Sequence, residues 1–325
     1  MNTLMDKMIE KINTQYQDNH PIVCIPDGED ERILEALKYL KNMDIVLLGA
    51  IDIIEEKLAH YRYDESINVK VLQPFVCDTV IDNVLSKTKG FKKSISREFL
   101  IEWSIHAPSF AMMLLKANYV DCVVGGSSYP TKEILSPMLK LIKAKEEGKL
   151  ISSYMLLIKG EENLIFSDCA LNIDYDVDGY VNLIYDTYQS ASKLGITPNI
   201  ALLSYSTLGS GSGDSIEFIK QALTKFNSTY PQLADSVCGE IQFDAAYDIE
   251  VRKKKIGKSN SLAINTFIFP DLNSGNIGYK IAQYLGGYKA IGPIIQGASQ
   301  PVNDLSRGAK PEEIAQVIYL TVASI

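Results

Sequence analysis

Short apolar segments alternate with longer amphipathic segments along the whole chain. The apolar runs predict strands, and the longer segments, in which apolar residues recur at helical spacing, predict helices. The predicted strands are 21–25, 44–48, 69–72, 122–124, 151–158, 200–203 and 266–269. The predicted helices are 29–41, 51–60, 109–116, 215–226, 245–255, 277–284 and 312–321. Such alternation predicts βαβ units and a mostly parallel sheet, with strands buried on both faces.

The same pattern indicates more than one domain. A chain of 325 residues is long enough for about two. The polar segment 144–149 lies near the middle and precedes a new predicted strand, which makes it the best first boundary. Gly286-Gly287 and Gly292-Pro293 interrupt the pattern further on, but they place the second boundary less clearly.

Charge and length exclude two classes of function. Acidic residues number 40 and basic residues 32, and only five of the basic ones are arginines: Arg32, Arg62, Arg97, Arg252 and Arg307. Non-specific nucleic-acid binding relies on clustered Lys and Arg, so it is not expected here. The apolar runs are shorter than a membrane span, and residues 1–15 lack the apolar core of a secretion signal. We expect a cytoplasmic protein that does not bind membranes.

The cysteines and histidines form no recognisable site. The five cysteines are widely spaced and mostly within apolar segments, which favours reduced, buried thiols over a disulfide framework. No zinc-binding spacing occurs, so we expect no metal. Cys169 lacks a nearby histidine that could activate it as a nucleophile, and a buried structural thiol is the favoured interpretation.

The glycine-rich turn 204–214 follows a predicted strand and opens a predicted helix. Backbone N–H groups in such a turn can bind an anion. The spacing of its glycines matches neither the dinucleotide fingerprint nor a phosphate-binding P-loop. Phosphate binding and a flexible connection capped by Asp214 are equally supported.

Three further loops have similar positions. The loop 125–131 also joins a strand to a helix, although an ordinary turn with a Ser or Thr cap is favoured for it alone. In 271–280, polar side chains lie near a helix start, where capping is a sufficient explanation. In 300–308, Arg307 lies in a polar loop. Its guanidinium suits a bound phosphate or, in a purely structural role, a carboxylate partner such as Asp304.

The spacing of Glu240, Asp244 and Asp248 favours a solvated acidic helix face over a metal site.

Taken together and in this order, these segments resemble the phosphate acetyltransferases. The resemblance begins at Ile-Pro-Asp-Gly-Glu-Asp-Glu-Arg (25–32) and spans nearly the whole chain. It continues through 167–172, 201–214 and 239–246, and it is closest over 269–280, 291–297 and Pro-Val-Asn-Asp-Leu-Ser-Arg-Gly (301–308). The resemblance implies the fold of the isocitrate and isopropylmalate dehydrogenases: two three-layer α/β domains around a cleft. The domains would be 1–147 with 293–325, and 148–292; the family also implies a homodimer.

The resemblance implies reversible transfer of an acetyl group between acetyl phosphate and coenzyme A, which releases or consumes inorganic phosphate. Coenzyme A is a substrate, and no cofactor or metal is implied. Arg307 would hold the phosphate, Ser306 would stabilise the oxyanion, and Glu313, with Glu312 beside it, would be the base. The implied substrate-binding residues are Ser127, Ser128, Thr131, Ser206, Thr207, Gly209, Asn273, Asn276, Lys280 and Asn303.

The chain departs from the family pattern in its arginines. Ser136 stands where the family usually has Arg, and Ser86 or Lys87 stands at another expected Arg. Transfer of propionyl or butyryl groups and a weakened paralogue that binds coenzyme A or acyl phosphate are therefore alternatives. A dehydrogenase on the same fold is a further alternative, which would require nicotinamide binding.

Overall fold

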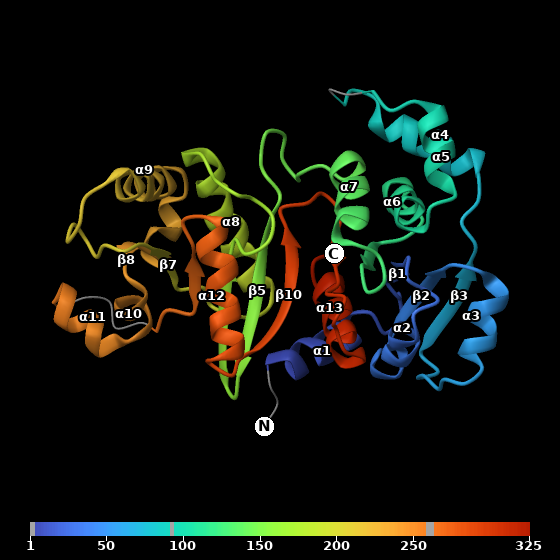
Figure 1. Ribbon diagram of the computed structural model, residues 1–325, viewed down its shortest axis with the longest axis horizontal. Coiled ribbons are helices and arrows are strands. Elements are labelled where there is room, and N and C mark those ends of the chain that lie inside the picture. Colours follow the sequence, from blue (N-terminus) through green and yellow to red (C-terminus); the bar gives the residue numbers. More distant parts are fainter. Residues whose placement is uncertain (1–3, 92–93, 258–262) are drawn as a thin grey trace. The chain divides into compact units, whose positions relative to one another are not determined.

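The computed structural model describes residues 4–91, 94–257 and 263–325 (Figure 1). The chain divides into two compact units, Met1–Glu147 with Ala298–Ile325, and Gly148–Gly297. Residues 293–297, expected in the first domain, lie in the second unit instead. They complete strand β10 (Lys289–Gln296), which pairs with β5 (Ser152–Lys159). Gly292-Pro293 marks a register shift in that pairing, and the chain returns to the first unit only at Ala298.

The first unit contains a five-stranded sheet in the order β11-β4-β1-β2-β3, and every pairing in it is parallel. This agrees with the parallel βαβ pattern that the alternating apolar runs predict. The strands are β1 (Ile22–Ile25), β2 (Met43–Leu48), β3 (Ile67–Leu72), β4 (Cys122–Gly125) and β11 (Val302–Asp304). The last strand comes from the returning C-terminal segment, which pairs beside β4.

The helices of the first unit form two packed groups. One contains α1 (Leu4–Gln15), α2 (Glu31–Ala36), the short η1 (Leu37–Tyr39) and α13 (Pro311–Val322). The other contains α4 (Asp78–Thr88), α5 (Arg97–Ser104), α6 (Ala107–Ala117) and α7 (Thr131–Leu141). Helix α3 (Ile51–Leu58) packs beside β3. Strand β4 contacts both α13 and α6, so both groups reach the centre of the sheet.

The second unit has a six-stranded sheet in the order β10-β5-β6-β9-β7-β8. Its strands β10, β5 and β6 (Glu162–Ser167) are antiparallel neighbours. The remaining pairings, which involve β9 (Thr266–Ile268), β7 (Ile200–Leu203) and β8 (Val237–Ile241), are parallel. This sheet is therefore mixed, with three parallel and two antiparallel pairings among its described strands, whereas the sequence pattern predicts a mostly parallel sheet.

Alternate residues of β7 face opposite sides of this sheet. Ile200 and Leu202 pack with α8 (Val177–Lys193) and α9 (Asp214–Thr229), whereas Ala201 and Leu203 pack with the opposite cluster. That cluster includes α10 (Phe243–Tyr247), α11 (Ile249–Ile256) and α12 (Leu272–Tyr284). Because both faces are covered by helices, β7 is apolar at every position and shows no polar alternation. The α/β class expected from the sequence is confirmed.

One predicted helix is wrong. The segment 245–255 is not continuous, because Asp248 ends α10 and caps α11 through the N–H groups of Glu250 and Val251. The short helix η2 (Pro231–Ser236) and several other elements were missing from the pattern as well. Short polar elements leave weak periodicity, which is why the sequence pattern misses them.

The cysteines agree with the expectation of free, mostly buried thiols. All five cysteines are free; Cys24, Cys122 and Cys169 are buried, and Cys77 and Cys238 are partly so. Burial raises the pKa of the Cys169 thiol well above its usual value, which agrees with a structural thiol.

Of the helices in the described ranges, none is both long and apolar enough to cross a membrane.

Candidate active site

Three loops of the first unit meet at one edge of its sheet. Strands β11, β4 and β1 are neighbours and run parallel, so the loops that follow them begin side by side. This is the edge at which ligands bind in open α/β sheets. It brings together four predicted site residues from two distant segments: Ser128 and Thr131, and Ser306 and Arg307.

Asp27 organises the loop after β4. Its carboxylate accepts hydrogen bonds from the N–H groups of Gly126 (2.8 Å), Ser128 (2.7 Å) and Tyr129 (3.2 Å). The side chain is buried, and burial raises its pKa against the opposing effect of these bonds. The backbone donors of this loop are thus used by a carboxylate of the protein itself.

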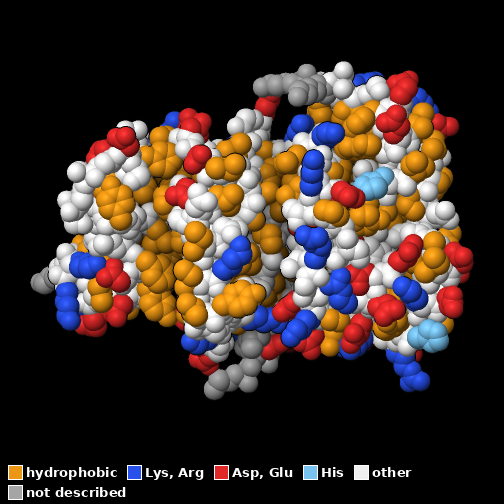
Figure 2. Space-filling view, in the orientation of Figure 1, with side chains coloured by type: hydrophobic (Ala, Val, Ile, Leu, Met, Phe, Trp, Pro, Cys, Tyr) orange, Lys and Arg blue, Asp and Glu red, His pale blue; other side chains and the backbone are white. Residues whose placement is uncertain are grey.

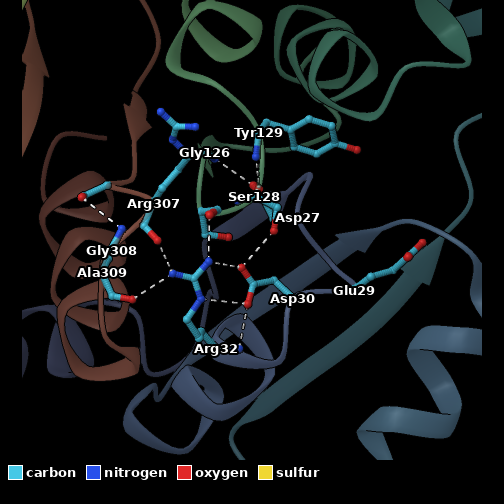
Figure 3. A network of polar contacts seen from close by, with 12 residues as sticks. Asp27, Glu29, Asp30, Arg32, Gly126, Ser128, Tyr129, Arg307, Gly308 and Ala309 are labelled. Carbon is cyan, nitrogen blue, oxygen red and sulfur yellow. Dashed lines mark hydrogen bonds and ion pairs between the residues drawn. The ribbon is translucent and has the colours of Figure 1, made fainter.

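Arg32 connects all three loops (Figure 3). Its guanidinium donates to Asp30 Oδ2 (2.6 Å), to the carbonyl oxygen of Ser127 (2.7 Å) and to that of Arg307 (2.6 Å). Asp30 is also the N-cap of α2. Burial raises the pKa of Asp30, but the hydrogen bonds from Arg32 outweigh it and lower the pKa to about 2. Arg32 is therefore a structural clamp, and its guanidinium is already engaged.

Arg307 has the opposite environment. Ser306, Arg307 and Gly308 are exposed, while the strand before them and Ala309 after them are buried. Figure 3 shows the Arg307 side chain directed away from Arg32. No described residue receives a hydrogen bond from its guanidinium. The clamp thus holds the backbone of Arg307 and leaves its guanidinium available for an anion.

The two candidate bases lie at the start of α13. Glu313 accepts a hydrogen bond from the N–H of Lys310 (3.0 Å) through Oε2, so its side chain reaches back to the N-cap residue of α13. Glu312 is exposed and accepts from the Tyr39 hydroxyl (3.1 Å). Glu313 keeps its second oxygen, Oε1, outside that cap, whereas Glu312 is directed toward Tyr39.

The glycine-rich turn of the second unit is held by Glu240. This buried carboxylate accepts from the Gly209 N–H (2.6 Å) and the Ser206 hydroxyl (3.2 Å). The Gly211 N–H donates to Ser206 Oγ (2.9 Å), and the Thr207 hydroxyl pairs with Gln242. These internal bonds occupy donors that the phosphate interpretation required, so the structure favours the connecting-turn interpretation. Its helix is capped by Gly213, and Asp214 is the first helical residue.

The acidic stripe expected at Glu240, Asp244 and Asp248 is wrong. Glu240 is buried at the end of β8, Asp244 is exposed and paired with Lys255 (2.7 Å), and Asp248 is a helix cap. The three residues do not share a helix face because the strand ends before α10 begins. Within the described ranges, no group of three or more His, Cys, Asp or Glu is arranged to hold a metal ion.

The predicted residues on α12 differ in their surroundings. Asn273 and Lys280 are exposed, and Asn276 is partly buried. Asn276 donates to the carbonyl oxygen of Cys169 (3.0 Å) and accepts from Lys280. The start of α12 approaches this loop so closely that a Cβ on Gly275 would lie 2.1 Å from the Asp168 carbonyl oxygen. Asn276 thus has a structural contact, while Asn273 and Lys280 remain accessible.

The structure does not fit a substrate contact for Asn303. Asn303 is 1% exposed and donates to the Thr321 hydroxyl of α13 (2.7 Å). Asn303 lies within β11, and its side chain is on the face that α13 covers. Ser127, Ser206 and Thr207 are buried as well, and in the first unit Ser128, Thr131, Ser306 and Arg307 are the exposed candidates beside the sheet edge.

Comparisons with known proteins match one family over nearly the whole chain. A family model described as phosphate acetyl/butaryl transferase matches residues 7–322. The chain belongs to this family. The phosphate acetyltransferase of Staphylococcus epidermidis is 35% identical over 98% of this chain and 99% of its own.

Two solved structures of family members have the same fold. The EutD phosphotransacetylase from Staphylococcus aureus is 32% identical, covers 98% of each chain and has a TM-score of 0.86. The phosphotransacetylase from Streptococcus pyogenes is also 32% identical, covers 98% of this chain and 97% of its own, and has a TM-score of 0.88. The family resemblance seen in the sequence motifs is confirmed.

Sequence reasoning missed Asp27, Asp30 and Glu240 as the residues that hold the loops. Asp27 and Asp30 lie within the quoted motif 25–32, and Glu240 within 239–246. An acidic residue at the end of a buried strand was the available signal. Its hydrogen-bond partners lie about 100 residues away for Asp27, so the sequence could not identify them.

Proposed function

We propose that this chain is a phosphate acetyltransferase that moves an acetyl group reversibly between acetyl phosphate and coenzyme A. The observation that carries the proposal is the exposed guanidinium of Arg307 on a backbone fixed by Arg32. The relatives that share the fold and a third of the sequence are named phosphate acetyltransferase or phosphotransacetylase. Coenzyme A serves as a substrate, and the proposal includes no cofactor and no metal.

The reaction requires a thiolate, an oxyanion donor and a site for phosphate. In the proposed mechanism Glu313 removes the thiol proton of coenzyme A through Oε1, because Oε2 is held by the Lys310 N–H. The thiolate sulfur attacks the acetyl carbonyl carbon, and the Ser306 hydroxyl donates to the developing oxyanion. The carbon–oxygen bond to phosphate then breaks, and Arg307 stabilises the departing phosphate. Ser128 and Thr131 are proposed as neighbouring substrate contacts; their hydroxyls donate to Asp30 Oδ2 and Asp304 Oδ2 in this structure, so each would meet the substrate as an acceptor or after releasing that bond.

Arg307→Ala tests this assignment. The variant should lower kcat/KM for acetyl phosphate by about a hundredfold or more, because the phosphate loses its charged partner. Arg307→Lys should recover only part of the loss, since an ammonium group cannot bind phosphate bidentately. Arg62→Ala removes another exposed arginine of the same unit and is the control. Equal thioester formation by Arg307→Ala and Arg62→Ala would contradict the assigned role.

Chain-length preference is a second question, because the family description includes butyryl as well as acetyl transfer. We propose acetyl phosphate as the preferred substrate, with propionyl and butyryl phosphates as the alternatives. Thioester formation from the three acyl phosphates, measured under the same conditions, decides between them. A protein that binds coenzyme A tightly but forms no thioester from any of them would be the weakened paralogue.

We also propose that two copies of the chain pair through α12. This helix buries only Gly275; Ile277 (57% exposed), Ile281 (53%) and Tyr284 (80%) on it and Leu285 (84%) at its C-cap are exposed. Figure 2 shows hydrophobic side chains gathered over this helix. Helical spacing places these residues on one apolar stripe of the kind that a second subunit covers.

We also propose a cytoplasmic location, which the free thiols support.

The oligomeric state can be measured by analytical ultracentrifugation. Ile281→Glu should shift the protein from dimer to monomer, since a charge on the stripe would be desolvated in the interface. Ile105→Glu, at an exposed position outside α12, is the control and should leave the dimer intact. A monomeric wild-type protein would refute the pairing.

A further inference from the structure

The carboxyl group of Asp304 has an unusual environment at the end of β11. The residue is 5% exposed, and its Oδ2 accepts a hydrogen bond from the Thr131 hydroxyl (2.8 Å). Its Oδ1 is buried and has no hydrogen-bond partner among the described residues. A Cβ on Gly126 would lie 2.2 Å from Oδ1, so the loop backbone covers this oxygen closely. Asp304 is therefore placed behind the loops and not at the surface where a substrate would bind.

Two charged groups act on Asp304 from the loops around it. The carboxylate of Asp27, after β1, disfavours its ionisation, and the guanidinium of Arg307, in its own loop, favours it. The residue paired with it on β4 is Gly125, and the next residue is Leu305, so neither adds a charge. Burial is the largest influence and raises the pKa of Asp304 to about 6; the Thr131 bond opposes this.

We propose that Asp304 takes up a proton when a phosphate-like anion binds Arg307, so that anion affinity and the protonation of Asp304 are coupled. This inference rests on the anion-binding role proposed for Arg307. A bound anion neutralises the positive charge that favours ionised Asp304, and it brings further negative charge into the site. The ionised carboxyl then has one hydrogen bond and a like charge nearby, which makes the neutral acid the more stable form. The proton comes from solvent.

The coupling is reciprocal, so protonation of Asp304 must strengthen anion binding by the same factor. Binding of phosphate or an acyl phosphate would thus be tighter below the pKa of Asp304 than above it. Release of phosphate would return the proton. In this role Asp304 acts through Arg307 and does not touch the reacting atoms.

Calorimetric titration with sulfate tests the coupling, because the charge of sulfate does not change between pH 5.5 and 7.5. The full-length protein is titrated in buffers of different ionisation enthalpy, which reveals the protons taken up on binding. The wild-type protein should take up about half a proton near pH 6.5, and its affinity should fall about three- to tenfold from pH 5.5 to 7.5. Asp304→Asn should bind sulfate without proton uptake and with nearly constant affinity.

A second variant tests the same group without removing it. Thr131→Val deletes the hydrogen bond that favours the ionised carboxyl, so the pH of maximal proton uptake should rise. An unchanged pH of maximal uptake would count against Asp304 as the responsible group. This measurement stands even if Asp304→Asn does not fold.

His106, which lies beside the same loop, is the main competing proton acceptor. Its ring lies 5.8 Å from the ring of Tyr129, and its Nε2 lies 3.0 Å from Glu133 Oε2. His106→Gln should keep the proton uptake, as should Asp52→Asn, which makes the same charge change at an exposed position. Proton uptake that persists in Asp304→Asn, or disappears in His106→Gln, would overturn the inference. If wild-type binding takes up no proton while Arg307→Ala still abolishes acetyl transfer, only the coupling is wrong.

Discussion

The two glycine-rich loops that follow β4 and β7 look alike in sequence, and both are held by a buried carboxylate. Asp27 binds three backbone N–H groups of the first loop, and Glu240 binds one N–H group and one hydroxyl of the second. In both cases a protein carboxylate occupies donors that a phosphate would use. A glycine-rich turn between a strand and a helix is therefore insufficient evidence for phosphate binding.

The loops differ in what is attached to them. The first is clamped by Arg32 to the Ser306–Gly308 turn, where the guanidinium of Arg307 is exposed. In the second, the exposed residues are Tyr205, Leu208, Gly209, Ser210, Ser212 and Gly213, none of which is cationic. A rigidly held loop therefore supports an anion site only where a cationic side chain is also exposed beside it.

Matching glycine substitutions should show the largest difference between the loops. Gly126 has φ +105°, and an added Cβ would lie 2.2 Å from Asp304 Oδ1. Gly126→Ala should reduce the free energy of unfolding by about 4 kcal/mol, since backbone strain and a steric clash combine. Gly209 has φ +89° with nothing within 4 Å, so Gly209→Ala should cost about 1 kcal/mol, from strain alone. Urea unfolding measures both, and equal losses would mean that the contact with Asp304 does not constrain the first loop.

Removing the charge of each carboxylate should give the next largest difference. Asp27→Asn should reduce the free energy of unfolding by about 3 kcal/mol, because three buried N–H groups lose a charged acceptor. Glu240→Gln should cost about 1 kcal/mol, since the amide oxygen can still accept from Gly209. The same urea titrations give these values. A larger loss for Glu240→Gln would reverse our ranking of the two loops.

The smallest effect is the dependence of stability on pH, and it concerns the first loop. Burial raises the pKa of folded Asp304 to about 6, above the unfolded value of about 3.9. The contribution of this group is fully present below pH 4 and is lost as the pH rises through 6. Asp304→Asn should therefore gain about 2 kcal/mol relative to wild type between pH 4.5 and 7.5. Asp52→Asn serves as the control, and a parallel pH profile for Asp304→Asn and wild type would refute the burial argument.

Much of the fold was readable from the apolar pattern. The strands 44–48 and 200–203 were predicted to within one residue, because strands covered on both faces are apolar at every position. The break at Asp248 was missed, since the residues on either side have helical periodicity and only the side-chain cap stops the first helix. The end of the second unit was missed because β10 crosses Gly292-Pro293 and continues to Gln296.

The candidate site was less predictable than the fold. The motif 301–308 identified Ser306 and Arg307, both of which are exposed. It also suggested Asn303, whose side chain is buried against α13. The sequence could not distinguish these cases, because Asn303 lies in β11 and is covered by α13, whereas Ser306 and Arg307 lie in the loop after the strand, and only the packing of α13 decides which side chains are covered.

The sequence by itself determined the α/β class, the family and the short list of five arginines. These follow from local periodicity, from motifs and from counting. Only the tertiary structure decided which arginine is free to act. Arg32 and Arg307 are 275 positions apart, yet the first donates to the backbone of the second. Parallel pairing of β1, β4 and β11 brings them together, and it makes one guanidinium a clamp while the other remains exposed.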